Sequence, residues 1–284
     1  MSSISVIIPS RNEPYLSHTI DDILKKFQEE LEIIVVFDGA FADIKDDERV
    51  HYINFNSPRG MRNAINCAVS IARVEYIMKV DAHCMFDEGV DVKLKADFDD
   101  DWVSIPRRKR LDPERWELTE LNKPDIDYMY LSHPEDPSVW GGKSLQGKEW
   151  REKNTITDQF PEIDDLMTFQ GSCWFMKKKY FHHLELMDQK NYGEFAKEAQ
   201  EIGLKAWLSG VRVIRNKKTW YAHWHKPKSR GRGYSLSNSE FAKGSEFTAR
   251  WVSYQMFKWQ NRKFSWLIDK FNPPGWKGDH ENAK

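Results

Sequence analysis

The chain has 284 residues and a mass of 33.6 kDa, which is enough for one large α/β domain or two small domains with a substantial core. Hydrophobic residues make up 40% and charged residues 31%, and the mean hydropathy is −0.72. No apolar run approaches the roughly 20 residues that cross a bilayer. These values disfavour a small stapled scaffold, a repeat array and stable membrane insertion. The first residues lack a basic leader with a long apolar stretch, so we expect a cytoplasmic protein.

The cysteines do not suggest a cross-linked framework. Cys67, Cys84 and Cys173 are odd in number, widely spaced and form no CxxC pair. This pattern predicts reduced, mostly buried thiols and neither a disulfide framework nor a zinc ribbon.

Tryptophan and charge are unevenly distributed along the chain. Seven of the twelve tryptophans lie from Trp207 onward. The net charge is only −1, yet residues 87–101 hold seven acids, whereas residues 202–239 hold nine Lys or Arg and no acid. We therefore expect the basic, Trp-rich last third of the chain to face an acceptor, since tryptophan is suited to stacking against a ring, a sugar or a base.

The first hundred residues alternate in the manner of a parallel α/β protein. The near-continuous β-branched runs Ile4–Ile8 and Glu32–Phe37 are typical of strands that are covered on both faces. Between them, apolar residues recur at helical spacing. The predicted order is strand, helix, strand, strand, helix, strand, over residues 4–8, 16–27, 32–37, 51–55, 61–72 and 75–80.

The pattern is weaker after residue 87. We predict a strand over 102–105, a helix over 192–209, a strand over 211–214 and a helical tail over 239–270, which the prolines at 273 and 274 end. Residues 1–238 are expected to form the α/β domain, and 239–284 a helical extension packed on it.

Polar residues follow the predicted strands at their carboxyl ends, where open α/β sheets bind ligands. Asp81 and His83, two residues apart after a strand, could both bind a divalent ion whose remaining positions are filled by nucleotide phosphates. His223 could complete that set. An isolated D-x-H is weak evidence, and a single histidine after a strand is more often structural.

Two further segments could carry chemistry. Glu198 and Glu201 lie three apart in the predicted helix, so their carboxylates could address an incoming hydroxyl, although a solvated helix face is the simpler explanation. Residues 57–63 place Gly60 and the arginines Arg59 and Arg62 at the start of a helix, which suits a diphosphate.

Seven segments in fixed order carry a family resemblance: ISVIIPSRNE, VVFDGA, SPRGMRNAIN, EYIMKVDAHC, FQGSCWFM, KEAQEIGLKAWLSG and YAHWHK. Together they resemble the GT-A glycosyltransferases of family 2, which transfer sugars from nucleotide-sugar donors. The D-x-H form and the E-A-Q-E segment are more similar to the polypeptide N-acetylgalactosaminyltransferases. The resemblance implies a GT-A fold, a Rossmann-like nucleotide-diphospho-sugar transferase fold, with a helical, Trp-rich C-terminal extension.

The resemblance also implies roles for individual residues. Asp81, His83 and His223 would bind manganese, or magnesium in its place. The residues that would contact a nucleotide-sugar donor, most simply a UDP-sugar, are Pro9, Arg11, Asp38, Arg59, Arg62 and Asp81. Gly171, Ser172 and Trp174 would lie on the acceptor side. Trp140-Gly141-Gly142 and Glu194 are candidates for the lining of the sugar pocket.

One departure from the family concerns the mechanism. Inverting members usually carry Glu-Asp where this chain has Glu198-Ala199, so the usual base is missing. Either Glu198 or Glu201 supplies the base of an inverting reaction, or the enzyme retains configuration and the departing phosphate takes the proton. Retention is favoured.

The acceptor has several candidates. The basic runs 215–218 and 226–233 could form a lid over the donor or a track for a polyanion. The tail resembles the C-termini of tailed-phage glycosyltransferases, which implies a hydroxymethylated pyrimidine in phage DNA and a host cytoplasm. A surface polysaccharide and a protein hydroxyl are the alternatives, as is a non-catalytic module that binds a nucleotide or a carbohydrate. The oligomeric state cannot be read from the sequence.

Overall fold

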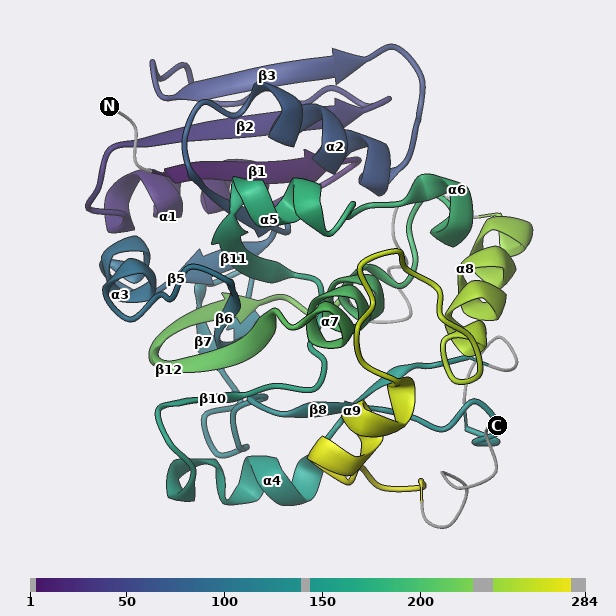
Figure 1. Ribbon diagram of the computed structural model, residues 1–284. Helices are drawn as coiled ribbons and strands as arrows, with labels where there is room; N and C mark the ends of the chain where they lie inside the picture. Colours follow the sequence, from purple (N-terminus) through teal and green to yellow (C-terminus); the bar gives the residue numbers. More distant parts are fainter. Residues whose placement is uncertain (1–3, 139–143, 227–236, 277–284) are drawn as a thin grey trace.

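The computed structural model describes residues 4–138, 144–226 and 237–276. Within these ranges a ten-stranded mixed sheet runs through the molecule in the order β10-β12-β6-β11-β4-β1-β2-β3, with β5 beside β12 and β7 beside β6 (Figure 1). Strands β8 and β9 form a separate pair. The strands are β1 Ile4–Ser10, β2 Leu31–Asp38, β3 Val50–Phe55, β4 Tyr76–Val80, β5 Cys84–Phe86, β6 Trp102–Asp112, β7 Glu117–Thr119, β8 Met129–Leu131, β9 Gly147–Glu149, β10 Ile163–Asp165, β11 Cys173–Lys177 and β12 Arg212–His223.

Helices cover both faces of this sheet, as Figure 1 shows. They are α1 Leu16–Lys26, α2 Met61–Ile71, α3 Val90–Ala96, α4 Arg151–Thr155, α5 Lys178–His183, α6 Gln189–Tyr192, α7 Glu198–Ser209, α8 Asn238–Arg250 and α9 Phe264–Phe271, with a short 3-10 turn over Thr157–Gln159.

The predicted βαββαβ half is confirmed. Strands β1 to β4 are parallel to one another, and β1 pairs with β2 from Ile4 opposite Leu31 to Ser10 opposite Phe37. Side chains alternate along each strand, so Val6 and Ile8 enter the core under α1 and α3, whereas Ile7 enters the core under α2. Burial on both faces explains why β1 and β2 are mostly apolar, whereas β3, at the edge of the sheet, is partly exposed.

The second half differs from the prediction. The strand predicted over 102–105 continues to Asp112, and the strand predicted over 211–214 continues to His223. Their distal halves, PRRKRLD and RNKKTWYAH, are too rich in charge to read as strands, yet the two pair in parallel along most of their length. Strand β11, which we did not predict, runs antiparallel between β4 and β6.

The helix predicted over 192–209 begins only at Glu198, and Tyr192 is instead the last residue of a separate short helix. Helix α6 ends at Gly193, with a φ of 76°, and α7 begins after Lys197, with a φ of 66°. Left-handed residues at both positions break the backbone hydrogen bonding. The break places the first turn of α7 at the end of the sheet where ligands would bind.

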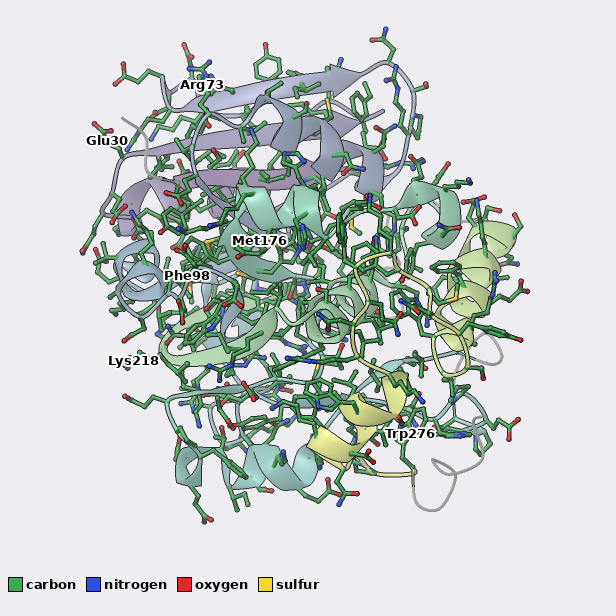
Figure 2. The ribbon with its side chains drawn as sticks, in the orientation of Figure 1. Glu30, Arg73, Phe98, Met176, Lys218 and Trp276 are labelled. Carbon is green, nitrogen blue, oxygen red and sulfur yellow. The ribbon has the colours of Figure 1, made fainter. Side chains whose placement is uncertain are left out.

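Contrary to our expectation, most tryptophans in the last third of the chain are not presented to a partner. Trp207, Trp251 and Trp276 are each no more than 4% exposed and belong to one hydrophobic core with α7 and α9. The Trp276 indole N–H donates to the carbonyl of Leu131 at 2.8 Å (its position is marked in Figure 2). Trp224 lines the cleft described below, and Trp259 is 48% exposed. Most of the tryptophan enrichment therefore serves packing.

All three cysteines are free, with Cys84 and Cys173 buried, as predicted. In the portion of the chain that the structure describes, no helix has the length and apolar character needed to span a bilayer.

Candidate active site

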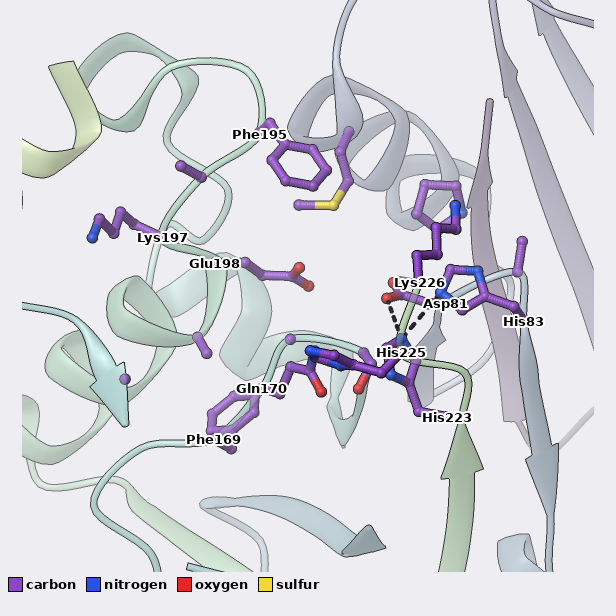
Figure 3. A pocket seen from close by; sticks show the side chains of 18 of the residues that line it. Asp81, His83, Phe169, Gln170, Phe195, Lys197, Glu198, His223, His225 and Lys226 are labelled. Carbon is purple, nitrogen blue, oxygen red and sulfur yellow. Dashed lines mark hydrogen bonds and ion pairs between the residues drawn. The ribbon is translucent and has the colours of Figure 1, made fainter. Parts of the chain in front are cut away.

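A cleft of about 900 Å³ opens at the carboxyl ends of β1, β2 and β4. This volume is at the upper end of the range for small-molecule sites, which leaves room for a donor and part of an acceptor. One wall comes from the strand ends, with Pro9, Arg11 and Asp38. The opposite wall comes from residues 169–172, from the start of α7, from β9 and from Phe241 of α8 (Figure 3).

Asp81, His83 and His223 meet in this cleft, although 140 residues separate the two histidines. Their ligand atoms all lie within 4.8 Å of one another. The two Nε2 atoms are 3.1 Å apart, and His223 Nε2 is 3.3 Å from Asp81 Oδ2 (Figure 3). The topology explains the meeting, because β5 follows Asp81 directly and pairs with β12, which places His223 opposite Cys84.

The charge states of this cluster suit a metal. Burial lowers the pKa of His223 to about 3, so its imidazole is neutral at pH 7. Burial alone would raise the pKa of Asp81, but the Lys79 ammonium and the His223 hydrogen bond outweigh it and hold that pKa well below its usual range. One carboxylate and two imidazole nitrogens fit manganese better than magnesium, which prefers oxygen ligands. The residues present therefore fit the manganese ion that the resemblance implies.

Glu13 orients one of these ligands and was missed by the sequence analysis. Its Oε2 lies 3.0 Å from His83 Nδ1, and its Oε1 accepts from the Lys226 ammonium at 2.6 Å. A carboxylate on Nδ1 favours the tautomer that leaves the Nε2 lone pair free for a metal. Through this second bond, Glu13 also links Lys226, three residues after His223, to the loop that follows β1.

We expect Glu13→Ala to weaken manganese binding about 10- to 100-fold, since residues that orient a metal ligand typically contribute that much. The free ion can be counted by electron paramagnetic resonance while manganese is titrated into the protein with UDP. Glu13→Gln keeps an acceptor oxygen and should lose less. Glu120→Gln, at an exposed pair with Lys123, is the matched control. Unchanged affinity in Glu13→Ala would contradict this role.

Lys79 joins the metal cluster to the opposite wall. This side chain is only 1% exposed, and its ammonium donates to Asp81 Oδ1 and to the Gly171 carbonyl, each at 2.6 Å. It also lies 3.3 Å from Glu198 Oε2. Burial disfavours the charge, but the two carboxylates outweigh burial and raise the pKa of Lys79. Lys79 is therefore a fully charged cation that bridges Asp81 and Glu198.

Glu198 points into the cleft from the first turn of α7 (Figure 3). Its Oε1 accepts from the Trp174 indole N–H at 2.7 Å, and its Oε2 faces Lys79. Burial raises the pKa of Glu198. Trp174 itself is fully buried, so it contacts Glu198 and does not line the cleft. Ser172 does line the cleft, and its hydroxyl lies 2.8 Å from that of Tyr221.

Gly171 leaves no room for a side chain beside Glu198. A Cβ at this position would lie 2.5 Å from Glu198 Oε2, and Trp174 and Lys79 prevent that carboxylate from moving aside. We expect Gly171→Ala to lower kcat about 10²-fold, because a displacement near 1 Å of a positioning group has that effect. Initial rates of donor turnover measure it, and thermal unfolding checks that the variant folds. Kinetics like those of the unmodified protein would contradict the tight packing.

On the donor side, Asp38 lines the cleft and also holds the loop before α2. Its carboxylate accepts from the N–H of Arg59 at 2.5 Å and from that of Gly60 at 3.1 Å, and Arg11 lies 3.9 Å away. Pro9, Arg11 and Glu194 also line the cleft. Arg59 is exposed, with its guanidinium 4.8 Å from the Phe55 ring, and does not line it.

Arg62 and Glu201 lie in the core, contrary to the positions we expected. Both side chains are fully buried and form an ion pair with each other. Arg62 also donates to the Ala196 carbonyl at 2.7 Å, and Glu201 accepts from Lys205 at 2.7 Å. Although Glu201 is one turn after Glu198, that turn carries it away from the cleft. As placed, neither residue can touch a substrate.

Most of the first basic run is also engaged elsewhere. Arg215 is 1% exposed and bonded to backbone carbonyls, Lys217 donates to the carbonyl of Phe160 at 3.0 Å, and Lys218 pairs with Asp97. These residues belong to β12 and do not line the cleft. From the second run, Lys226 lines the cleft, whereas residues 227–233 lie outside the described residues, as does Trp140-Gly141-Gly142.

A mixed sheet with helices on both faces, and an Asp-His-His cluster at its strand ends, define the GT-A class of nucleotide-sugar transferase folds. The profile of glycosyl transferase family 2 matches residues 5–185, and the chain belongs to that family. Both the predicted family and the predicted fold class are thereby confirmed.

Individual relatives agree with this assignment. The chain is 32% identical over 96 residues to the glycosyltransferase GlyG of Streptococcus pneumoniae, which is 31% of this chain and 32% of GlyG. It is 25% identical over 240 residues to the uncharacterized glycosyltransferase EpsJ of Bacillus subtilis, which is 80% of this chain and 62% of EpsJ. The chain thus spans less than two thirds of either relative.

A solved structure of GalNAc-T7 with UDP, GalNAc and Mn2+ has a similar fold, with a TM-score of 0.70. The similarity covers 95% of this chain and 57% of that one, at 14% identity. Identity this low supports the fold alone.

Proposed function

We propose that this chain is a manganese-dependent glycosyltransferase that moves a sugar from a UDP-sugar to a hydroxyl group. The observation that carries the proposal is the convergence of Asp81, His83 and His223 at the strand ends of a family 2 chain. Bound there, the ion would neutralise the diphosphate as it leaves. Magnesium is the weaker candidate because of the two imidazole ligands.

The other cleft residues have roles that follow from their positions. Pro9, Arg11 and Asp38 hold the nucleotide at the ends of β1 and β2. Glu198, fixed by Trp174 and Lys79, presents its carboxylate to the transferred sugar. Gly171 lies next to Glu198, and together with Ser172, which also lines the cleft, it receives the acceptor.

We propose that configuration is retained. An inverting reaction needs a carboxylate that is free to take the acceptor's proton. Glu201 is sealed in the core, and both oxygens of Glu198 face fixed cationic or N–H donors. In the retaining reaction the bond from sugar C1 to the phosphate oxygen breaks, the acceptor oxygen bonds C1 on the same face, and its proton passes to the departing phosphate. NMR of the first-formed product tests this, because an inverted anomeric centre would refute it.

Thermal unfolding with UDP and manganese together, against UDP alone, tests the donor site. We expect stabilisation that requires the metal, together with slow donor hydrolysis. If both are missing, the chain is a non-catalytic nucleotide- or carbohydrate-binding module.

The acceptor is tested with a radiolabelled UDP-sugar and three separate pools: hydroxymethylated DNA, lipid-linked glycan and protein. A hydroxymethylated pyrimidine in phage DNA stays our sequence-based hypothesis, but the β12 residues Arg215, Lys217 and Lys218 no longer support it, because they lie outside the cleft. Label in the lipid or protein pool alone would refute it.

A further inference from the structure

Three of the four Lys and Arg side chains that line the cleft, all but Lys197, have a carboxylate within 4 Å. Arg11 lies 3.9 Å from Asp38, and Lys226 donates to Glu13 at 2.6 Å. Lys79, just beneath the cleft, is bonded to Asp81. Lys197 lines the same cleft but differs, because within residues 4–138, 144–226 and 237–276 its ammonium has no hydrogen bond and no ion pair. Its ammonium lies 5.9 Å from the centre of the Phe241 ring.

Three local features of Lys197 are each unfavourable. The residue is only 8% exposed, and burial lowers the pKa of its ammonium to about 8. Its φ of 66° is left-handed, which costs a residue other than glycine about 1 kcal/mol or more. It is also the residue before the first turn of α7, where the helix dipole disfavours a cation. Local rules broken together at one residue of a cleft are typical of a functional site.

A second cation in the cleft, Arg108, is paired with a carboxylate about as loosely as Arg11 is. Arg108 of β6 is 7% exposed and lies 3.8 Å from Glu149, which is beyond hydrogen-bonding distance. Within the described residues, its guanidinium donates no hydrogen bond. Its guanidinium has five N–H donors, which are therefore available to a ligand in the cleft.

Lys197 lies on the side of Glu198 away from the metal cluster, as Figure 3 shows. The diphosphate of a donor would sit at the cluster, which leaves Lys197 to face what lies beyond the transferred sugar. We propose that the acceptor carries a carboxylate or phosphate group and that Lys197 binds it. This inference rests on the proposed function, since it assigns the acceptor end of that same cleft.

The same anionic chemistry could belong to the donor, if the transferred sugar were a uronic acid. The positions favour the acceptor, because Glu198 stands between Lys197 and the cluster. They also favour an anionic glycan over a duplex nucleic acid, because a cleft of about 900 Å³ admits single sugar or nucleotide units. A uronic acid on the donor and a nucleic acid as the acceptor are the two alternatives, and the experiment distinguishes both from an anionic glycan acceptor.

The experiment compares galactose, galacturonate and galactose 6-phosphate as probes, each titrated into the full chain with UDP and manganese and followed by NMR. We expect the anionic probes to bind at least tenfold more tightly than galactose. Lys197→Met should remove this preference, and Lys197→Arg should keep part of it, while the affinity for UDP with manganese stays within twofold. Lys218→Met is the matched control, because Lys218 pairs with Asp97 at the surface (Figure 2).

Thermal unfolding separates a binding role from a structural one. Without ligand, Lys197→Met should unfold about 2–6 °C higher, because it removes a buried charge that no carboxylate neutralises. A lower unfolding temperature, or equal binding of all three probes to the unmodified chain, would overturn the inference.

Two further arms identify the source of the anion. If Lys197→Met weakens UDP-glucuronate but not UDP-glucose, the anion belongs to the donor, which overturns the acceptor assignment. If a single-stranded oligonucleotide binds in a Lys197-dependent way and the sugar acids do not, the glycan assignment is overturned. Preference for the anionic probes without any sugar transfer would refute the proposed function and leave the anion site standing.

Discussion

His223→Ala is expected to lower kcat/KM for sugar transfer by about 10²- to 10³-fold, the effect of removing one electrostatic group that stabilises a leaving anion. His223 is one of three side chains whose ligand atoms lie within 4.8 Å, and its neutral imidazole does not have to lose a proton before binding an ion. Removing it leaves Asp81 and His83, which is too small a set to hold the ion firmly.

His223 is a sharper test than Asp81. Asp81 also neutralises the buried ammonium of Lys79, so Asp81→Asn would disturb the fold as well as the metal. Manganese affinity in the presence of UDP is measured by calorimetry beside the kinetics, and His51→Ala, on β3, is the matched control. Manganese affinity and transfer rate that both survive His223→Ala would show that the metal binds elsewhere.

The part of the site that could be predicted from sequence is the part built by local rules. Asp81 and His83 follow a buried parallel strand, and the carboxyl end of such a strand is where ligands bind. Strands β1 and β2 could be predicted because burial on both faces makes each one a nearly apolar run. His223 was identified through the family resemblance, since its partners are 140 residues away.

What could not be predicted depends on pairing between distant segments. Strands β6 and β12 have charged distal halves, and each is a strand there because it pairs with the other. Glu198 and Glu201 are equivalent in a helix pattern, but α7 meets the cleft only with its first turn, so only Glu198 reaches it. Glu13 had no signal beyond its place in the segment ISVIIPSRNE.

The role of Lys79 could have been recognised from the sequence, because it is a charged residue inside the otherwise apolar, buried strand YIMKV. Two residues before Asp81, it projects from the same face of the strand, so the two side chains are neighbours by the period of two. A lysine in a strand without solvent access needs a carboxylate partner. The sequence therefore allowed the Lys79–Asp81 pair to be found, whereas the contact with Glu198, 119 residues away, required the fold.

Lys79→Met is expected to destabilise the chain by about 3–5 kcal/mol, because removing one partner of a buried ionic cluster leaves its remaining charges without compensation. The Lys79 side chain is 1% exposed, and its ammonium has three acceptors, on Asp81, Gly171 and Glu198. Asp81 keeps a hydrogen bond from His223, but Glu198 keeps only the Trp174 indole.

The free energy of unfolding from urea titration measures this effect, with Lys218→Met, at a surface ion pair, as the control that should change by less than about 1 kcal/mol. Without Lys79, the Glu198 carboxylate is the buried charge with the fewest remaining partners. The double variant Lys79→Met/Glu198→Gln removes that charge, so it should recover part of the lost free energy of unfolding. Because residues in one ionic network are coupled, the two substitutions should be less destabilising together than the sum of each alone. Additive losses would mean that Lys79 and Glu198 do not interact, and would contradict the role of Lys79 as a bridge between the metal cluster and Glu198.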